Sequence, residues 1–143
     1  GHMVYSVDFA AKPIEYLNEI KSKEDIDNLF PLHKDIFNLN RQYLGFFDIV
    51  VEYTCFCAID PQRRPQYSDL VSSVLNKSGK FVALFFPTEK MREDLDKGPP
   101  FYVKLEETLL MFKNNFNIIK IDKNPDSIKP RKGFEILVIM ERK

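Results

Sequence analysis

Three carboxylates, Asp8, Asp35 and Glu52, lie at or just after the ends of short apolar segments. These segments are predicted strands, and in open parallel α/β sheets ligands bind at the carboxyl ends of the strands. At that edge Asp8 can accept hydrogen bonds from both hydroxyls of a ribose. Asp35 can accept one from the exocyclic amine of adenine, and Ile36 and Phe37 can offer apolar surface to the base. The recurrence of acids at three successive strand ends therefore favours a ligand of the nucleoside type.

Each acid also has a structural interpretation. Asp8 precedes a predicted helix, where its side chain can satisfy free amides of the first turn, and taken alone this interpretation is the stronger one. Asp35 can simply be a turn residue. Glu52 follows an apolar run and can be a solvated strand end or half of an ion pair. No single position is specific, so the ligand hypothesis depends on the coincidence of all three.

Cys55 and Cys57 are the only cysteines of the chain. Two residues apart in an extended segment, they face the same side. A disulfide framework needs more cysteines and a zinc site needs a second pair of ligands, while His33 lies far away in the sequence. The spacing therefore favours two reduced cysteines with small, buried side chains over metal binding or nucleophilic catalysis, and contact with a substrate at the predicted ligand edge is a weaker alternative.

The elements that position these residues alternate between strand and helix. The predicted strands are Val4–Asp8, Phe30–His33, Phe46–Tyr53, Lys80–Phe86, Asn117–Asp122 and Phe134–Met140, and the predicted helices are Ala10–Ile20, Arg63–Leu75 and Lys104–Asn114. Lys23–Phe30 is left open between helix and loop, Asn76–Gly79 is a predicted helix stop, and Thr88–Pro100 is a predicted loop. Alternating apolar strands and amphipathic helices imply an α/β fold with a parallel sheet covered on both faces.

The last two predicted strands depart from this rule. The connector Lys123–Lys132 is rich in turn residues and shows no helical period. A parallel crossover usually needs a helix, so these two strands are predicted to be antiparallel. The sequence thus indicates a doubly wound sheet that ends in one antiparallel strand.

Composition limits the remaining possibilities. The chain has 143 residues, of which 44% are hydrophobic and 29% charged, as in one globular domain. Lys plus Arg equals Asp plus Glu at 21 each, which argues against nucleic-acid binding. No apolar run suits a membrane span or a secretory segment, so we expect a cytoplasmic protein. Residues 1–3 are interpreted as a tag scar and start Met, and residues 4–143 as a single domain that begins in mid-strand.

Several short motifs occur in one order along the chain. They are Val7-Asp8 with Ile14, Lys34–Phe37, Phe47–Pro61 followed by Arg64-Pro65, Gly98–Phe101, and Asn124–Ile128 with Pro130–Gly133 and Glu135. The third comprises an acid, Tyr-Thr, an aromatic residue, Cys-Ala, an acid before Pro, and Arg-Pro. Together they resemble the thiol/halide (thiopurine S-methyltransferase-like) family of class I S-adenosylmethionine-dependent methyltransferases. The resemblance covers nearly the whole chain.

The resemblance implies methyl transfer from S-adenosylmethionine to a small-molecule acceptor: a thiol, a thiopurine-type sulfur, hydrosulfide or a halide. An anionic acceptor needs no general base, so no catalytic side chain is expected, and the protein contributes geometry and a dry pocket. The implied cofactor-binding residues are Asp8, Phe9, Asp35, Ile36, Phe37, Glu52 and Tyr53. The implied substrate-binding residues are Phe56, Pro99, Pro100, Phe101 and Arg131.

One departure from the family pattern is large. The family has a strand and a Gly-x-Gly-x-x-type loop before the position of Val4, and no such loop occurs in this sequence. Because glycine there allows the backbone to approach the cofactor, we expect a Rossmann-like sheet without its first strand and an inactive or weak chain. Exposed strand edges would then favour a homo-oligomer. The alternative is a non-catalytic remnant that acts as an oligomerising or interaction module, and a different α/β nucleotide binder is a weaker third possibility.

Overall fold

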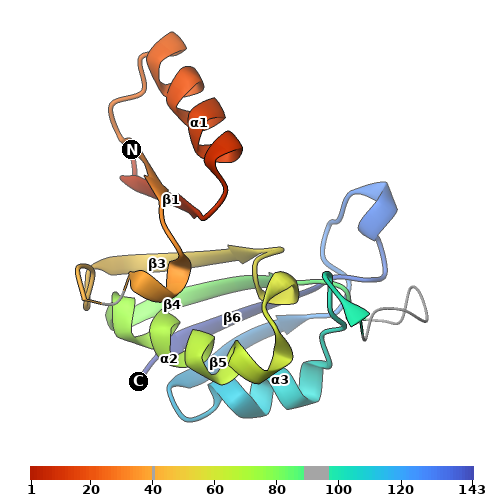
Figure 1. Ribbon diagram of the computed structural model, residues 1–143. Helices are drawn as coiled ribbons and strands as arrows, with labels where there is room; N and C mark the ends of the chain where they lie inside the picture. The colour runs from red at the N-terminus through yellow and green to blue at the C-terminus, as the bar shows by residue number, and fades with distance from the viewer. Residues whose placement is uncertain (40, 89–96) are drawn as a thin grey trace. The chain divides into compact units, whose positions relative to one another are not determined.

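The computed structural model describes residues 1–39, 41–88 and 97–143 (Figure 1). Its main elements are β1 (Val4–Asp8), α1 (Ala11–Lys23), β2 (Leu29–His33), β3 (Phe47–Tyr53), α2 (Arg64–Val74), β4 (Leu75–Phe85), α3 (Leu105–Phe112), β5 (Phe116–Asp122) and β6 (Ile136–Arg142). The chain divides into two compact units, residues 1–42 and 43–143. Residues 89–96 of the predicted loop Thr88–Pro100, Glu89 among them, lie outside the described residues.

The first unit is a β-α-β element. β1 and β2 pair in parallel, with Asp8 opposite His33 at their carboxyl ends. Helix α1 contacts both strands and buries Ile14. The sequence left Lys23–Phe30 open between helix and loop. In the structure α1 ends at Lys23, and a turn with Asp25 at φ 53° then leads into β2.

The second unit contains a four-stranded sheet in the order β3-β4-β6-β5. β3 and β4 are parallel, whereas β6 runs antiparallel to both of its neighbours. The prediction that the last two strands are antiparallel is therefore confirmed. The connector between them contains only one short 3₁₀ turn, Lys129–Arg131.

An aromatic core joins the helices α2 and α3 to this sheet. Phe81 and Phe85 of β4 contact Phe112 of α3, and Phe85 also meets Phe56 in the segment after β3. Tyr67 of α2 packs on Phe56 and Phe81. The two helices therefore lie on the same face of the sheet, as Figure 1 shows. Alternate residues point to the other face, where Ile49, Val51, Ile119 and Ile121 remain exposed.

The predicted helix stop is confirmed, because α2 ends at Val74, but the predicted start of the next strand at Lys80 is wrong. β4 begins at once with Leu75. The pairing of β4 with β3 is irregular there, because Phe47 pairs with Leu75 while Ile49 pairs with Lys80. Ser78 at φ 64° belongs to this irregular stretch. The turn-forming residues thus make a bulged start of a strand rather than a loop.

Candidate functional site

A pocket of about 290 Å³ opens at the carboxyl ends of β3 and β4. Residues from three segments line it: Thr54, Cys57 and Ala58 after β3, Phe86 after β4 with Pro99 and Pro100 farther along, and Arg131 before β6. This is the edge at which parallel α/β sheets bind ligands. Of the predicted substrate-binding residues, the structure brings Pro99, Pro100 and Arg131 together at this pocket.

Arg131 lies between two aromatic rings. Its guanidinium carbon is 4.8 Å from the centre of the Tyr53 ring and 4.7 Å from that of Phe86. Nη1 lies 3.4 Å from Oε1 of Glu135, whose side chain is only 1% exposed. A guanidinium carries five N–H donors, so this arrangement fixes the group while leaving donors for a ligand. The site can therefore hold a small anion against an apolar wall.

Glu52 organises the turn that follows β3. Its Oε1 accepts a hydrogen bond from the Phe56 amide at 2.9 Å, and its Oε2 accepts one from the Tyr67 hydroxyl at 3.1 Å. Burial raises the pKa of this carboxyl, and its bonds to the Phe56 amide and the Tyr67 hydroxyl oppose that rise. Burial also raises the pKa of Tyr67 well above its ordinary value. Both oxygens of Glu52 are thus engaged inside this unit, and its predicted contact with a cofactor stays a prediction.

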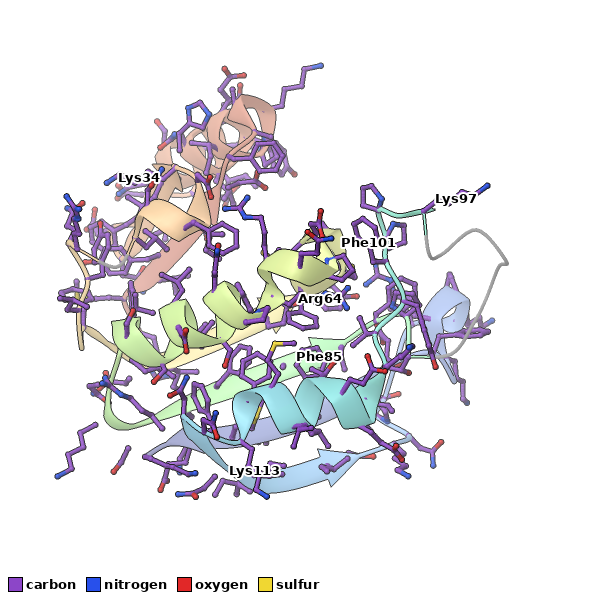
Figure 2. All side chains as sticks on the ribbon, turned by 60° about the horizontal axis from the view of Figure 1, so that its bottom comes forward. Lys34, Arg64, Phe85, Lys97, Phe101 and Lys113 are labelled. Atoms are coloured by element: carbon purple, nitrogen blue, oxygen red, sulfur yellow. The ribbon has the colours of Figure 1, made fainter. Side chains whose placement is uncertain are left out.

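Two hydrogen bonds hold the Gly98–Phe101 segment and the adjoining Tyr102 beside the pocket. The Phe101 amide donates to the Cys57 carbonyl at 2.7 Å, and Arg64 Nη1 donates to the Tyr102 carbonyl at 3.1 Å. Figure 2 shows Arg64 at the start of α2, beside the segment that carries Phe101. The Arg64 guanidinium also stacks on the ring of Phe56 at 4.5 Å. These hydrogen bonds position Pro99 and Pro100 in the pocket lining.

Two predicted substrate-binding residues, Phe56 and Phe101, do not line the pocket. Phe56 is fully buried in the aromatic core, and Phe101 is half-buried. Sequence reasoning placed Thr54 at a strand end where a ligand is expected, but it assigned no role in the pocket to Ala58 and Phe86. Ala58 belongs to the motif after β3, so the motif could have suggested it, but Phe86 carries no signal beyond its place at a strand end.

Cys57 is a neutral thiol in this pocket. Its Sγ donates to the Thr54 carbonyl at 3.2 Å, and burial raises its pKa to about 11. A nucleophilic thiolate is therefore absent at neutral pH. Neither Cys55 nor Cys57 forms a disulfide with another described residue. Within the described ranges, no group of three or more His, Cys, Asp or Glu side chains could hold a metal ion.

The first unit presents two carboxylates at the ends of its parallel strands. Asp8 Oδ1 accepts from the Ala10 amide at 2.8 Å, and Asp35 Oδ1 accepts from the Phe37 amide at 3.0 Å. The Lys34 amide donates to the Asp8 carbonyl, so the two ends are adjacent. The N-cap of α1 is Ala10, not Asp8, which corrects the structural interpretation of that acid. Each carboxylate keeps one oxygen with no partner among the described residues.

The other predicted cofactor-binding residues of this unit surround those acids. Ile36 and Phe37 are half-buried on the 3₁₀ turn Ile36–Asn38 that Asp35 caps. Phe9 is 79% exposed, and its carbonyl oxygen lies 2.9 Å from Nε2 of the His33 ring. Paired carboxylates beside apolar surface suit the ribose and adenine of a nucleoside. The residues present therefore fit the adenosine half of S-adenosylmethionine, and their cofactor role stays a prediction.

Comparison with known proteins identifies the ancestry of this arrangement. The sequence profile described as Thiopurine S-methyltransferase matches residues 1–142. The chain belongs to the thiopurine S-methyltransferase family. This membership agrees with the resemblance found in the motifs after β3 and before β6.

Curated relatives of the family support this identification. Thiocyanate methyltransferase 1 of Arabidopsis thaliana is 29% identical over 138 residues, which cover 94% of this chain and 57% of that protein. The probable thiol methyltransferase 2 of Arabidopsis thaliana is 33% identical over 92 residues, 64% of this chain and 39% of the relative. Thiopurine S-methyltransferase of Bos taurus is 28% identical over 108 residues, 76% of this chain and 43% of the relative. The chain thus spans about half the length of the curated relatives it matches.

Solved structures show the same fold. A Pyrococcus horikoshii OT3 protein superposes with a TM-score of 0.78 at 19% identity, covering all of this chain and 73% of that one. The 1,6-didemethyltoxoflavin-N1-methyltransferase of Burkholderia thailandensis, solved with bound 1,6-didemethyltoxoflavin and S-adenosylhomocysteine, gives 0.71 at 19% identity, covering 100% of this chain and 62% of that one. The predicted Rossmann-like α/β fold with mixed strand directions is confirmed. No helix among the described residues has the length and apolarity of a membrane crossing.

Proposed function

We propose that this chain serves S-adenosylmethionine-dependent methylation of a small sulfur nucleophile, such as a thiol, a thiopurine-type sulfur or thiocyanate, or of a halide. The observation that carries the proposal is Arg131, which is fixed between Tyr53 and Phe86 at the mouth of the pocket. The names of the curated relatives point to the same class of acceptor.

The acceptor half of this proposal depends on charge. Sulfur acceptors and halides react as anions, and Arg131 supplies a cation that Glu135 neutralises only through one long contact of 3.4 Å. The side chains of Phe86, Pro99 and Pro100 provide a wall without hydrogen-bond donors, which excludes water from the anion and keeps it nucleophilic. Cys57 is neutral and does not compete as a nucleophile. An acceptor that is already an anion requires no general base at this pocket.

The donor half depends on the first unit. Asp8 would accept from the ribose hydroxyls, and Asp35 with Ile36 and Phe37 would receive the adenine. S-adenosylmethionine, when bound, supplies the electrophilic methyl group on its sulfonium. The sequence contains no glycine-rich loop of the Gly-x-Gly-x-x type, so we expect the 143-residue chain to bind this donor weakly. Methyl transfer by the chain alone is accordingly expected to be slow or absent.

Anion binding tests the acceptor proposal without requiring catalysis. Titration with ¹³C-labelled thiocyanate, followed by NMR, should show saturable binding to the chain. Arg131→Met should weaken that binding by about tenfold or more, because a charge-assisted hydrogen bond is lost. The matched control is Lys132→Met, which removes a neighbouring exposed charge that does not line the pocket. Equal losses in the two variants would indicate general electrostatic attraction and contradict the proposal.

A second proposal concerns self-association. β3 pairs only with β4 among the described residues, and its Ile49, Val51 and Tyr53 are about half exposed or more. An exposed apolar strand without charged or proline residues at these positions favours pairing with another copy. We therefore expect a homo-oligomer by light scattering. Val51→Lys should shift the chain toward monomer while the fold is retained, and a wild-type chain that is monomeric at high concentration would refute this proposal.

A further inference from the structure

Thr54, the first residue after β3, has a backbone conformation that its side chain disfavours. Its φ is +66°, in the left-handed region. Two other described residues that are not glycine share a positive φ, Asp25 and Ser78, and neither is β-branched. A β-branched residue there is a genuine outlier, because its branched Cβ crowds the backbone. Thr54 is also the only one of the three that lines the pocket.

The surroundings fix this conformation from both sides. Before Thr54, Tyr53 is held in the ladder opposite Leu84 of β4, and the Glu52 side chain is buried. After it, the Phe56 amide binds Glu52, and the thiol of Cys57 donates to the carbonyl of Thr54 itself. Such outliers persist where neighbouring structure over-determines them, and they cluster at functional sites. The tight turn places Thr54 in the pocket lining.

The hydroxyl of Thr54 has no hydrogen-bond partner among the residues that the structure describes. A threonine hydroxyl can donate one hydrogen bond, and the neighbouring pocket surfaces from Ala58, Phe86, Pro99 and Pro100 offer side chains without a donor. Among the described lining residues, Arg131 is the other strong side-chain donor. A single guanidinium attracts an anion, but its several N–H donors allow the anion to bind at more than one place. A second donor from a different segment would fix the acceptor atom at one point.

We propose that Thr54 is an acceptor-binding residue, whose hydroxyl donates to the anion that Arg131 attracts and so sets its position for methyl transfer. This inference rests on the proposed function, because it assumes that the pocket takes an anionic acceptor. It assigns the two residues different roles: Arg131 attracts the anion by its charge, and Thr54 fixes the position of the acceptor atom by a hydrogen bond. It also explains why threonine occupies a position whose positive φ glycine or asparagine would adopt with less strain.

The inference predicts that stability and binding change in opposite directions at this position. Thr54→Gly removes both the crowding and the hydroxyl, so it should raise the melting temperature and weaken anion binding. Thr54→Ser keeps the hydroxyl and loses the branching methyl, so its affinity should stay within about twofold of wild type. A residue with a merely structural role would not separate these two readouts.

The decisive comparison uses Thr54→Val, which keeps the branched shape but loses the donor. With ¹³C-labelled thiocyanate as the probe and the full chain as the sample, we expect a Kd about tenfold higher than wild type, the effect of one hydrogen bond to a charged group. Thr108→Val is the matched control, because Thr108 is buried on α3 and does not line the pocket. Its Kd should equal that of wild type. If Thr54→Val fails to fold, Thr54→Ala removes the same donor with less bulk.

The possible results separate the two proposals. Wild-type binding that Arg131→Met weakens but Thr54→Val and Thr54→Ala leave unchanged would overturn the role of Thr54 and leave the anion site intact. No saturable binding by wild type would overturn both. Weakened binding in Thr54→Val with retained affinity in Thr54→Ser supports the inference.

Discussion

The two units of this chain use the same sequence feature, an acid at the end of a parallel strand, in opposite ways. In the first unit, Asp8 and Asp35 each accept one hydrogen bond from an amide two residues ahead and keep the second oxygen available. In the second unit, Glu52 is 2% exposed and both of its oxygens have partners. The acids differ in side-chain length and in whether a helix packs over them. A short aspartate bonds its own loop at the rim, whereas the longer glutamate reaches the core beneath α2.

This contrast teaches that a strand-end acid is a ligand candidate only where the adjoining helix leaves it uncovered. In the second unit, Tyr67 of α2 closes over Glu52, and the ligand-facing charge is Arg131 instead. The two units therefore offer complementary chemistry, with carboxylates that can accept from hydroxyls and amines in one and a guanidinium that can donate to an anion in the other.

The largest expected effect is on stability, from removal of the buried acid. Glu52→Ala leaves the Phe56 amide and the Tyr67 hydroxyl without their partner in the core. We expect the free energy of unfolding to fall by about 3 kcal/mol, since each buried unsatisfied donor costs on the order of 1–3 kcal/mol. Asp8→Ala, which removes one half-buried bond, should cost below about 1 kcal/mol. Urea unfolding of both variants checks this, and similar losses would abolish the contrast between the units.

The next effect is the pH dependence of stability that Glu52 produces. Its pKa is raised in the folded chain, mainly by burial, so the folded state binds more protons than the unfolded state between the two pKa values. Stability must then rise as pH falls from above the folded pKa toward the unfolded value near 4.5. Glu52→Gln should remove this component. The test is the difference in unfolding free energy between wild type and variant across pH 4–8.

A difference that grows in the opposite direction would contradict this prediction. If wild type lost stability relative to Glu52→Gln on acidification, the bonds from the Phe56 amide and the Tyr67 hydroxyl would outweigh burial, and the carboxyl pKa would be depressed. The glutamine variant is the appropriate reference because it keeps an oxygen that can accept from the Phe56 amide. It cannot titrate, so the comparison isolates the charge.

The sequence predicted much of the fold but only part of the site. Strand and helix order followed from apolar periodicity, and the antiparallel pairing of β5 and β6 followed from a connector too rich in proline and turn residues to form a helix. The fate of Glu52 could not be predicted, because burial depends on Tyr67, fifteen residues away and on a different element. Thr54 carries no sequence signal for its left-handed backbone, since threonine there is unfavourable locally and only tertiary contacts impose it.

The loop motifs show the same limit. Gly98–Phe101 was recognisable as a unit, yet sequence alone did not distinguish its prolines, which line the pocket, from Phe101, whose amide anchors the segment to Cys57. Phe56 has an aromatic side chain beside a predicted ligand edge, and only the packing of Phe85 and Tyr67 around it shows that it belongs to the core. Residue type indicates what a position can do, and the neighbours decide which use applies.

The smallest effect on stability, and the sharpest test of the first unit, comes from Asp8→Asn. The amide oxygen of asparagine can still accept from the Ala10 amide, so the free energy of unfolding should change by less than about 0.5 kcal/mol. Binding of S-adenosylhomocysteine, which we expect to be weak in the wild-type chain, should weaken further by about fivefold to tenfold, because a neutral amide accepts from ribose hydroxyls less strongly than a carboxylate. NMR titration measures both chains, with Asp27→Asn as the control at an exposed position of the same unit. Equal affinities of Asp8→Asn and Asp27→Asn would mean that Asp8, like Glu52, serves only the fold. The contrast between the two units would then not hold for Asp8.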